Sequence, residues 1–312
     1  MNNRNVGIDV LKFFAVFLVM NSHMGICYPK YEVLSTGGSI GDALFFFASG
    51  FTLFLGRDLR FDNWYKRRIN RIYPSLLATA ILGCAIFGVS DNIIDVLLGE
   101  RYWFVGCILI YYIVLYPIKY YKLDGYKICA CGGGIITIIY FLFYNGENFY
   151  GGGSFRWFAY FLIMLQGAII GKKNKDDTFK PRYMAFLILS VTTWYTLFYL
   201  CSDNWLLLLS WIPLMGITRY TYLICNASFF KKLYDSKVFG QIIYIVSQLC
   251  LESYLIQKFI ISDNLNFIFP FNIPIVFIII LMFAYFTRTI AEFIAQTFRT
   301  EPYEWSKMLL RK

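Results

Sequence analysis

The sequence predicts an all-α fold, a polytopic integral membrane helical bundle of about ten transmembrane helices with both chain ends on the cytoplasmic side (N-in and C-in). Two observations predict this class. Hydrophobic residues make up 58% of the 312 residues, and the mean hydropathy is +0.55. They fall into apolar blocks of roughly 17 to 22 residues, the length that a helix needs to cross a bilayer, and short polar loops separate the blocks.

The first four blocks are bounded by clear signals. No short apolar region with a small-residue cleavage site opens the sequence, so 8–27 is predicted to be a retained span and not a signal peptide. The block at 38–56 contains the apolar run "SIGDALFFFASGFTLFLG". The third, 74–90, starts at the proline that ends a basic loop, and the fourth, 102–118, starts with "YWF".

The remaining six blocks are apolar runs of similar length. In the fifth, three adjacent glycines at Gly132–Gly134 permit the close approach of a neighbouring helix. The six predicted spans are 128–144, 155–171, 183–201, 205–225, 239–261 and 274–294.

The basic residues orient the bundle, because Lys and Arg concentrate in the cytoplasmic loops of membrane proteins. With the N-terminus inside, all but four of the 29 Lys and Arg lie at or near the cytoplasmic face. The four on the outer side are Lys30, Arg101, Arg156 and Lys258. The same bias explains most of the net charge of +10, so the charge does not require nucleic acid as a partner. The sequence has no motif for nucleic-acid recognition.

The eight cysteines imply neither a disulfide framework nor a metal site. Most lie inside predicted spans, and Cys129 and Cys131 share an apolar helix with no histidine nearby. No internal repeat or separate soluble domain stands out. Residues 1–312 are therefore expected to act as a single transmembrane domain.

Two ionisable residues of the first span, Lys12 and His23, are predicted to share one helix face. Eleven residues separate them, which at about 100° per residue is close to three full turns. Ionisable groups inside a membrane usually face a cavity and mark function. Asp9, three residues before Lys12, could form a local ion pair with it. The alternatives are that Lys12 snorkels to the interface and that His23, the only histidine, is satisfied by a backbone carbonyl.

The second span adds two polar residues on one face. Asp42 begins it at about the depth of His23, and Ser49 follows seven residues later. An Asp beside a His can hold the imidazole in one tautomer and support it as a base, which makes Asp42 a candidate catalytic residue. A capping or first-turn carboxylate is an equally good interpretation of Asp42. Ser-Gly in a span is often a packing notch.

The segment "RDLRFDNWYKRRINRIYP", Arg57 to Pro74, is a basic loop on the predicted cytoplasmic side. It carries six Lys and Arg against two Asp. Arg68 and Arg71, at i and i+3, present two guanidiniums on one helical face, a geometry suited to bidentate phosphate binding. The alternative is an ordinary positive-inside signal with contacts to anionic lipid headgroups.

Four features, in this order, resemble the acyltransferase 3 family of membrane-bound acyltransferases. They are the basic residue and the histidine of the first span, "LFFFASGF" in the second, the Arg-x-x-Arg before "IYP", and "YWF" at the start of the fourth. The resemblance covers nearly the whole chain. It implies a transmembrane O-acyltransferase, usually an O-acetyltransferase, that acts on sugars and other acceptors, often bacterial polysaccharide or lipid-linked glycans.

The resemblance also implies the partners. The donor is an acyl-CoA, usually acetyl-CoA, that serves as a co-substrate, with no permanently bound cofactor and no metal. His23 is the key catalytic residue, and Lys12, Arg68 and Arg71 bind the donor. The other partners are a cell-surface glycan or lipid-linked sugar as acceptor and the lipids of a bacterial cytoplasmic membrane, in which the protein is multi-pass.

The sequence departs from the family pattern at two positions. Many members have Arg where this chain has Lys12, which keeps the charge but loses the guanidinium fork. In the ninth span, "SQLCLESYLIQ" resembles a segment that commonly ends in His, whereas Gln257 stands here. His23 is therefore expected to work without a second imidazole. The hydrolase-like domain that is often fused to family members is not found in these 312 residues, so the bundle alone is expected to present the acceptor.

We expect His23 to take the proton of an acceptor hydroxyl as it attacks the thioester, by direct transfer or through an acyl-histidine relay. Further polar residues are candidates for lining the same cavity: Asp9, Ser49, Tyr102, Trp103 and Glu252. Glu252 could instead pair with a buried basic group, and Tyr102 and Trp103 could belong to an interfacial aromatic belt. Glu292, four residues after Arg288, is expected to form a structural ion pair.

A competing class is a transporter or flippase for an anionic or lipid-linked substrate, which would also need polar groups along a membrane path. The inverted repeats and paired broken helices typical of transporters are not visible in the sequence. A non-enzymatic membrane scaffold would leave the shared face of Lys12 and His23 unexplained.

Overall fold

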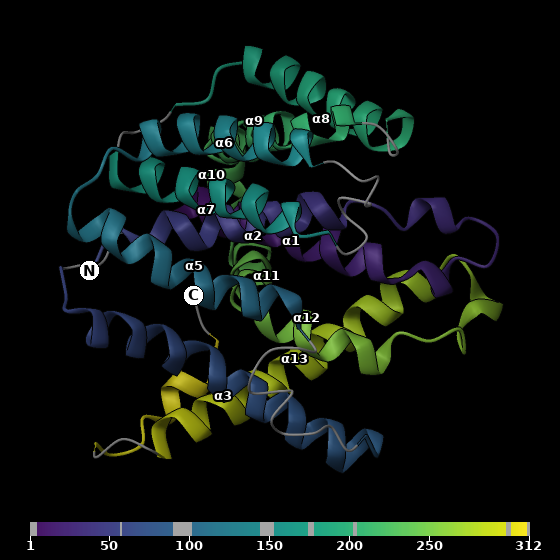
Figure 1. Ribbon diagram of the computed structural model, residues 1–312. Helices are drawn as coiled ribbons and strands as arrows, with labels where there is room; N and C mark the ends of the chain where they lie inside the picture. Colours follow the sequence, from purple (N-terminus) through teal and green to yellow (C-terminus); the bar gives the residue numbers. More distant parts are fainter. Residues whose placement is uncertain are drawn as a thin grey trace. The chain divides into compact units, whose positions relative to one another are not determined.

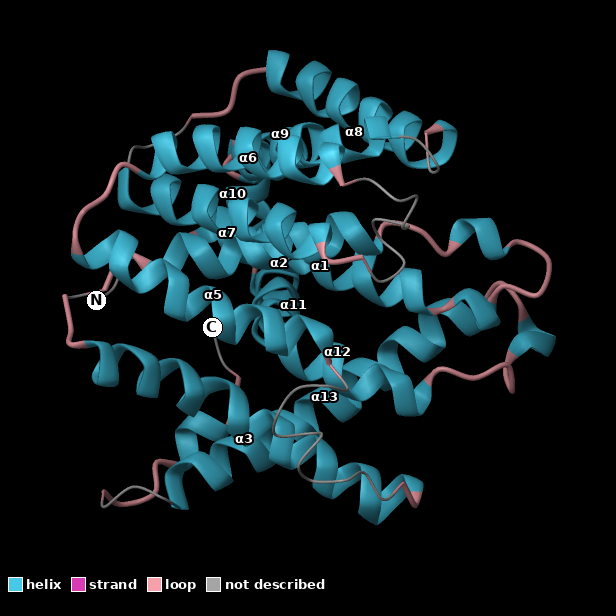
Figure 2. Ribbon diagram, in the orientation of Figure 1, coloured by secondary structure: helices cyan, strands magenta, loops and turns pink. Residues whose placement is uncertain are grey.

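The computed structural model describes residues 5–56, 58–89, 102–143, 153–173, 178–201, 205–297 and 301–310. Arg57 and Arg101, which enter the charge argument, lie outside these ranges. The described residues form α-helices and short 3-10 helices joined by loops and contain no strand, as Figure 2 shows. The predicted all-α class is confirmed.

Seven helical segments are long and apolar enough to cross a membrane. They are α1 (Val6–His23), α3 (Phe61–Phe87), α5 (Trp103–Tyr120), α6 (Gly125–Leu142), α8 (Arg182–Leu200), Trp205–Cys225 (η3, Trp205–Leu209, followed by α9, Trp211–Cys225) and α13 (Asn272–Thr297). An eighth is added if the bent pair α11 (Lys237–Gln248) and α12 (Cys250–Ile260) forms one span. The structure therefore supports seven to eight spans among the described residues.

The difference from the predicted ten comes from two helices that do form where spans were expected. Helix α2 (Gly38–Leu53) has only 16 residues, short for a bilayer crossing. Helix α7 (Phe155–Lys173) carries Arg156 in its first turn and two lysines at its end, which leaves little uninterrupted apolar length. One further short helix, α10 (Ser228–Asp235), was not predicted.

The chain forms two compact units. Unit 1 comprises residues 1–12, 42–58 and 114–235, and unit 2 comprises residues 13–41, 59–113 and 236–312. In unit 1, α7 contacts both α6 and α9, and α8 contacts α9 (Figure 1). In unit 2, α3, α12 and α13 contact one another.

Helices α2 and α7 of unit 1 approach with their backbones almost touching. A Cβ atom added at Gly167 or Gly171 would overlap the carbonyl oxygen of Phe47 or Phe51, and one added at Gly50 would overlap that of Met164. Small residues spaced four apart allow this kind of helix contact in membranes. The Ser49-Gly50 pair therefore includes the packing notch that the sequence suggested.

Helix α3 begins at Phe61, well before the predicted start of the third span. Pro74 lies inside it, so the basic segment is helical from Phe61 to the proline and is not a loop there. Proline in a helix interior loses one backbone hydrogen bond and usually marks a boundary, which explains the wrong prediction. The helix ends at Gly88, whose left-handed backbone (φ 65°) suits glycine and whose N–H caps the Gly83 carbonyl.

The predicted ninth span is broken at Leu249, where α11 and α12 meet at 76°. Three side chains around the break donate to backbone carbonyls: Ser247 to Tyr244 (2.8 Å), Cys250 to Ser247 (3.1 Å) and Ser253 to Leu249 (2.7 Å). Side-chain donors of this kind compete with regular helix bonds and favour bends. The break directs the start of α12 into the core of unit 2, where Glu252 is buried.

Candidate active site

His23 is the last residue of α1, and its ring is anchored on its own helix. Nδ1 lies 2.8 Å from the carbonyl oxygen of Val19, one turn earlier. A carbonyl oxygen only accepts hydrogen bonds, so in the neutral imidazole Nδ1 carries the proton and Nε2 has the lone pair. The side chain is exposed. A backbone carbonyl does satisfy one ring nitrogen, as the structural alternative expected, yet the other nitrogen keeps the form that a general base requires.

Tyr254 of α12 packs against the imidazole. The ring centroids of His23 and Tyr254 are 6.4 Å apart in an edge-to-face arrangement. Tyr254 in turn contacts the rings of Tyr102 (6.1 Å) and Phe104 (5.5 Å), which flank the start of α5. The structure thus links two predicted site residues, His23 and Tyr102, through a tyrosine that sequence reasoning missed.

Tyr102 is buried and fixed from two sides. Its hydroxyl donates to the Leu255 carbonyl over 3.4 Å, and the Lys258 ammonium lies 4.3 Å from its ring centroid. Tyr102, Lys258 and His23 all belong to unit 2. Of the three, Lys258 was assigned to the outer side from the distribution of Lys and Arg. Tyr254 lies inside the segment that resembles the family, "SQLCLESYLIQ", and Lys258 follows directly after it. This position in the sequence was the available signal for both.

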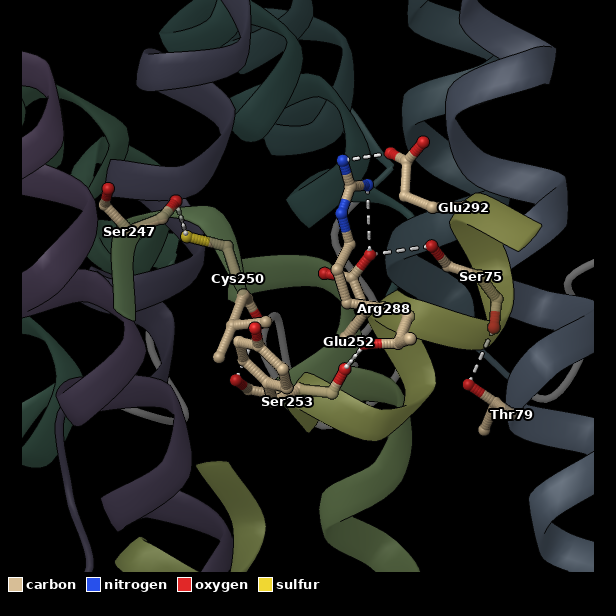
Figure 3. Close-up of polar contacts among 11 residues, drawn as sticks. Ser75, Thr79, Ser247, Cys250, Glu252, Ser253, Arg288 and Glu292 are labelled. Carbon is tan, nitrogen blue, oxygen red and sulfur yellow. Dashed lines mark hydrogen bonds and ion pairs between the residues drawn. The ribbon is translucent and has the colours of Figure 1, made fainter. Parts of the chain in front are cut away.

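Glu252 anchors α12 in a buried polar network, drawn in Figure 3. Its Oε1 accepts a hydrogen bond from Ser75 of α3 at 2.7 Å and lies 3.7 Å from Nη1 of Arg288 on α13. Arg288 also pairs with Glu292, which confirms the predicted structural ion pair. Glu252 is therefore paired with a half-buried arginine, close to the alternative that the sequence offered to a cavity-lining role. It joins three helices two residues before Tyr254.

Gln257 is buried on α12, at the position where the resembling family segment commonly has His. Its Oε1 has no hydrogen-bond partner among the described residues.

Trp103 opens α5 beside Tyr102 and packs edge to face on Phe104, with ring centroids 6.2 Å apart.

Arg68 and Arg71 lie one turn apart on α3 but in different surroundings. The Arg68 guanidinium lies over the rings of Trp64 (4.7 Å) and Tyr112 (5.9 Å), and the Trp64 indole donates to the Tyr112 carbonyl. Arg71 is exposed. One guanidinium is thus held by aromatic faces, whereas its partner is accessible to an anion.

The other predicted site residues belong to unit 1. Asp9 is buried and accepts a hydrogen bond from the Tyr234 hydroxyl at 2.8 Å, a partner that the sequence did not indicate. Lys12, Asp42 and Ser49 are half-buried, and Asp42 interacts electrostatically with Arg156 of α7. The roles of Asp42 beside His23 and of Lys12 at the donor stay predictions.

The fold and this site define a multi-pass helical membrane protein with an exposed imidazole at the end of α1. The sequence profile of the acyltransferase 3 family, described as an acyltransferase domain, matches residues 5–291. The chain belongs to this family, which confirms the resemblance and makes the protein a membrane acyltransferase. No curated protein and no solved structure matches the chain.

Proposed function

We propose that the protein is an O-acetyltransferase of the bacterial cytoplasmic membrane that moves an acetyl group from cytosolic acetyl-CoA to a hydroxyl of a cell-surface or lipid-linked glycan. Ten crossings with both chain ends in the cytosol belong to this proposal. The single observation that carries it is the 2.8 Å contact between Nδ1 of the exposed His23 and the Val19 carbonyl, which leaves Nε2 of the neutral ring available. Acyl transfer to a hydroxyl requires a base with a lone pair in reach of solvent or substrate.

In the proposed reaction, Nε2 of His23 removes the hydroxyl proton as the acceptor oxygen attacks the thioester carbonyl. The new C–O bond forms, the C–S bond breaks, and the thiolate of CoA leaves and takes the proton back from the imidazolium. The Nδ1 bond to the Val19 carbonyl supports this cycle, since the partial negative charge of that oxygen stabilises the imidazolium.

The donor is proposed to enter from the cytosolic side. Arg71, exposed on α3, and Arg68, one turn earlier, supply two guanidiniums for the phosphates of CoA. Lys12 adds a third positive charge on the helix that ends at His23. Asp42 is proposed to assist His23 from the start of the second span.

The test is transfer of label from radiolabelled acetyl-CoA to candidate glycans by purified protein in liposomes. We expect label in the acceptor, and a loss of about 10²–10⁴-fold in His23→Ala, with acetyl-CoA binding and thermal unfolding unchanged. His23→Gln, which keeps a hydrogen-bonding side chain but cannot act as the base, should lose activity equally. Near-normal transfer by His23→Ala would refute the catalytic role. Movement of an unmodified glycan across the membrane would favour the transporter alternative.

A further inference from the structure

A pocket of about 350 Å³ opens in unit 1 between α6, α7 and α9. It has no residue in common with the His23 site or with the proposed donor site. The lining residues follow helical spacing on each of the three helices, so each presents one face to the pocket. These residues are Tyr126, Cys129, Gln166, Ile169, Ile170, Lys173, Met215 and Arg219.

The lining combines two positive charges with apolar side chains. Lys173 and Arg219 supply the charges, and no carboxylate is among the described residues that line the pocket. Ile169, Ile170 and Met215 supply apolar surface. Such a lining is suited to an amphipathic anion, which has one charged group and a hydrocarbon part.

Several polar contacts hold the walls of the pocket in place. The Gln166 amide donates to the Met215 carbonyl at 3.2 Å, and its Oε1 accepts from the Thr218 hydroxyl at 2.9 Å. These bonds tie α7 to α9 beside the two cations. The Lys173 ammonium lies 4.4 Å from the ring centroid of Tyr126, which ties α7 to α6. The pocket is therefore formed before any ligand arrives, which lowers the entropic cost of binding.

We propose that this pocket binds the phosphate group of an anionic phospholipid, with the lipid chain along Ile169, Ile170 and Met215. Arg219 offers a guanidinium that can bind a phosphate at two points, and Lys173 adds a point charge. Basic pockets between membrane helices on the cytoplasmic side bind lipid headgroups. Lys173 ends α7, next to Lys172. In the ten-crossing, N-in orientation that we propose, this end of α7 faces the cytoplasmic leaflet.

Native mass spectrometry of the full-length protein in detergent tests the proposal, with phosphatidylglycerol as the probe and phosphatidylcholine for comparison. We expect Arg219→Gln and Lys173→Gln each to weaken phosphatidylglycerol binding about tenfold, the effect of losing one charge-assisted contact. Ile170→Trp, which fills the pocket and keeps both charges, should weaken it as well. Lys172 and Arg182 are exposed and do not line the pocket. The variants Lys172→Gln and Arg182→Gln are therefore matched controls, and each should change phosphatidylglycerol binding less than twofold.

The same titration separates the possible sources of phosphate. Inorganic phosphate and free CoA at millimolar concentration should not displace the lipid; displacement by either would overturn the lipid assignment in favour of a soluble phosphate ligand. Equal binding of phosphatidylcholine, equal weakening in the Lys172 and Arg182 controls, or full binding by folded Arg219→Gln and Lys173→Gln would also overturn it. Thermal unfolding of every variant checks folding. None of these measurements depends on acyl transfer.

Discussion

The imidazole of His23 and the phenol ring of Tyr254 meet edge to face, with an interplanar angle of 83° and centroids 6.4 Å apart. Tyr254 therefore limits ring motion from outside α1, while the Val19 carbonyl holds Nδ1 from within it. The two contacts act on different parts of the imidazole. Together they orient Nε2, the proposed base.

Tyr254→Ala is expected to lower the turnover number with little change in donor affinity, because it frees the orientation of His23 but removes no charge. An aromatic pair contributes about 0.5–1.5 kcal/mol beyond buried area, which corresponds to a loss of up to about tenfold. Tyr254→Phe keeps the ring and should retain activity. Steady-state kinetics and acetyl-CoA binding give the comparison, and a Phe variant as poor as Ala would assign the effect to the hydroxyl.

Replacing Glu252 with Ala should destabilise unit 2 by about 1–3 kcal/mol, since it leaves the buried Ser75 hydroxyl and one side of the Arg288 guanidinium without a partner. In this variant Arg288 still pairs with Glu292. The loss of stability should therefore be smaller than for a buried charge left with no partner. Ser75→Ala, which removes only the hydroxyl, should cost about 1 kcal/mol. Thermal unfolding in detergent measures both, and equal stability of Glu252→Ala and wild type would contradict the anchoring role.

Arg71→Ala is expected to weaken acetyl-CoA binding by about 1.5–3 kcal/mol, the contribution of one charge-assisted hydrogen bond. Because Arg71 is exposed, thermal stability should not change. Arg68→Ala should weaken binding as well and should also lower stability, since it removes the stacking on Trp64. Arg67→Ala, an exposed neighbour, is the matched control. If folded Arg71→Ala binds acetyl-CoA as well as the wild type does, Arg68 and Arg71 would serve only as positive charges that set the membrane orientation.

Cysteine labelling in intact cells tests the proposed orientation. On a background without the native cysteines, Lys30→Cys, in the loop between α1 and α2, should react with an impermeant maleimide. Lys180→Cys, just before α8, should react only after the cells are opened. Both positions are exposed, so the accessibility of the side chain does not limit the reaction. The reverse pattern would invert the bundle and move the proposed donor site to the outside.

The helices themselves were predictable, because hydropathy in blocks of span length is a strong local signal. The break at Leu249 was not, since "SQLCLES" contains no proline or glycine that would mark a helix end. The bonds of its Ser and Cys side chains to backbone carbonyls are visible only in the structure. The early start of α3 was hidden by the charged residues around Arg68 and by Pro74.

The candidate site was predictable only in part. His23 stood out as the single histidine of the sequence, inside a predicted span. Tyr254 did not, because it is one of 25 tyrosines and meets His23 only through the tertiary packing of α12 near the end of α1. Likewise, a basic partner for Glu252 could be anticipated, but the sequence did not identify it as Arg288, which is half-buried.

The hydrogen bond that sets the His23 tautomer has both of its ends within a single turn of α1. Neighbouring helices can therefore slide or tilt during a catalytic cycle without changing which ring nitrogen bears the proton. The imidazole and the carbonyl oxygen that holds its Nδ1 both belong to α1, so they move together. If His23 is the base that we propose, the helices around α1 can rearrange between turnovers while the proton stays on Nδ1.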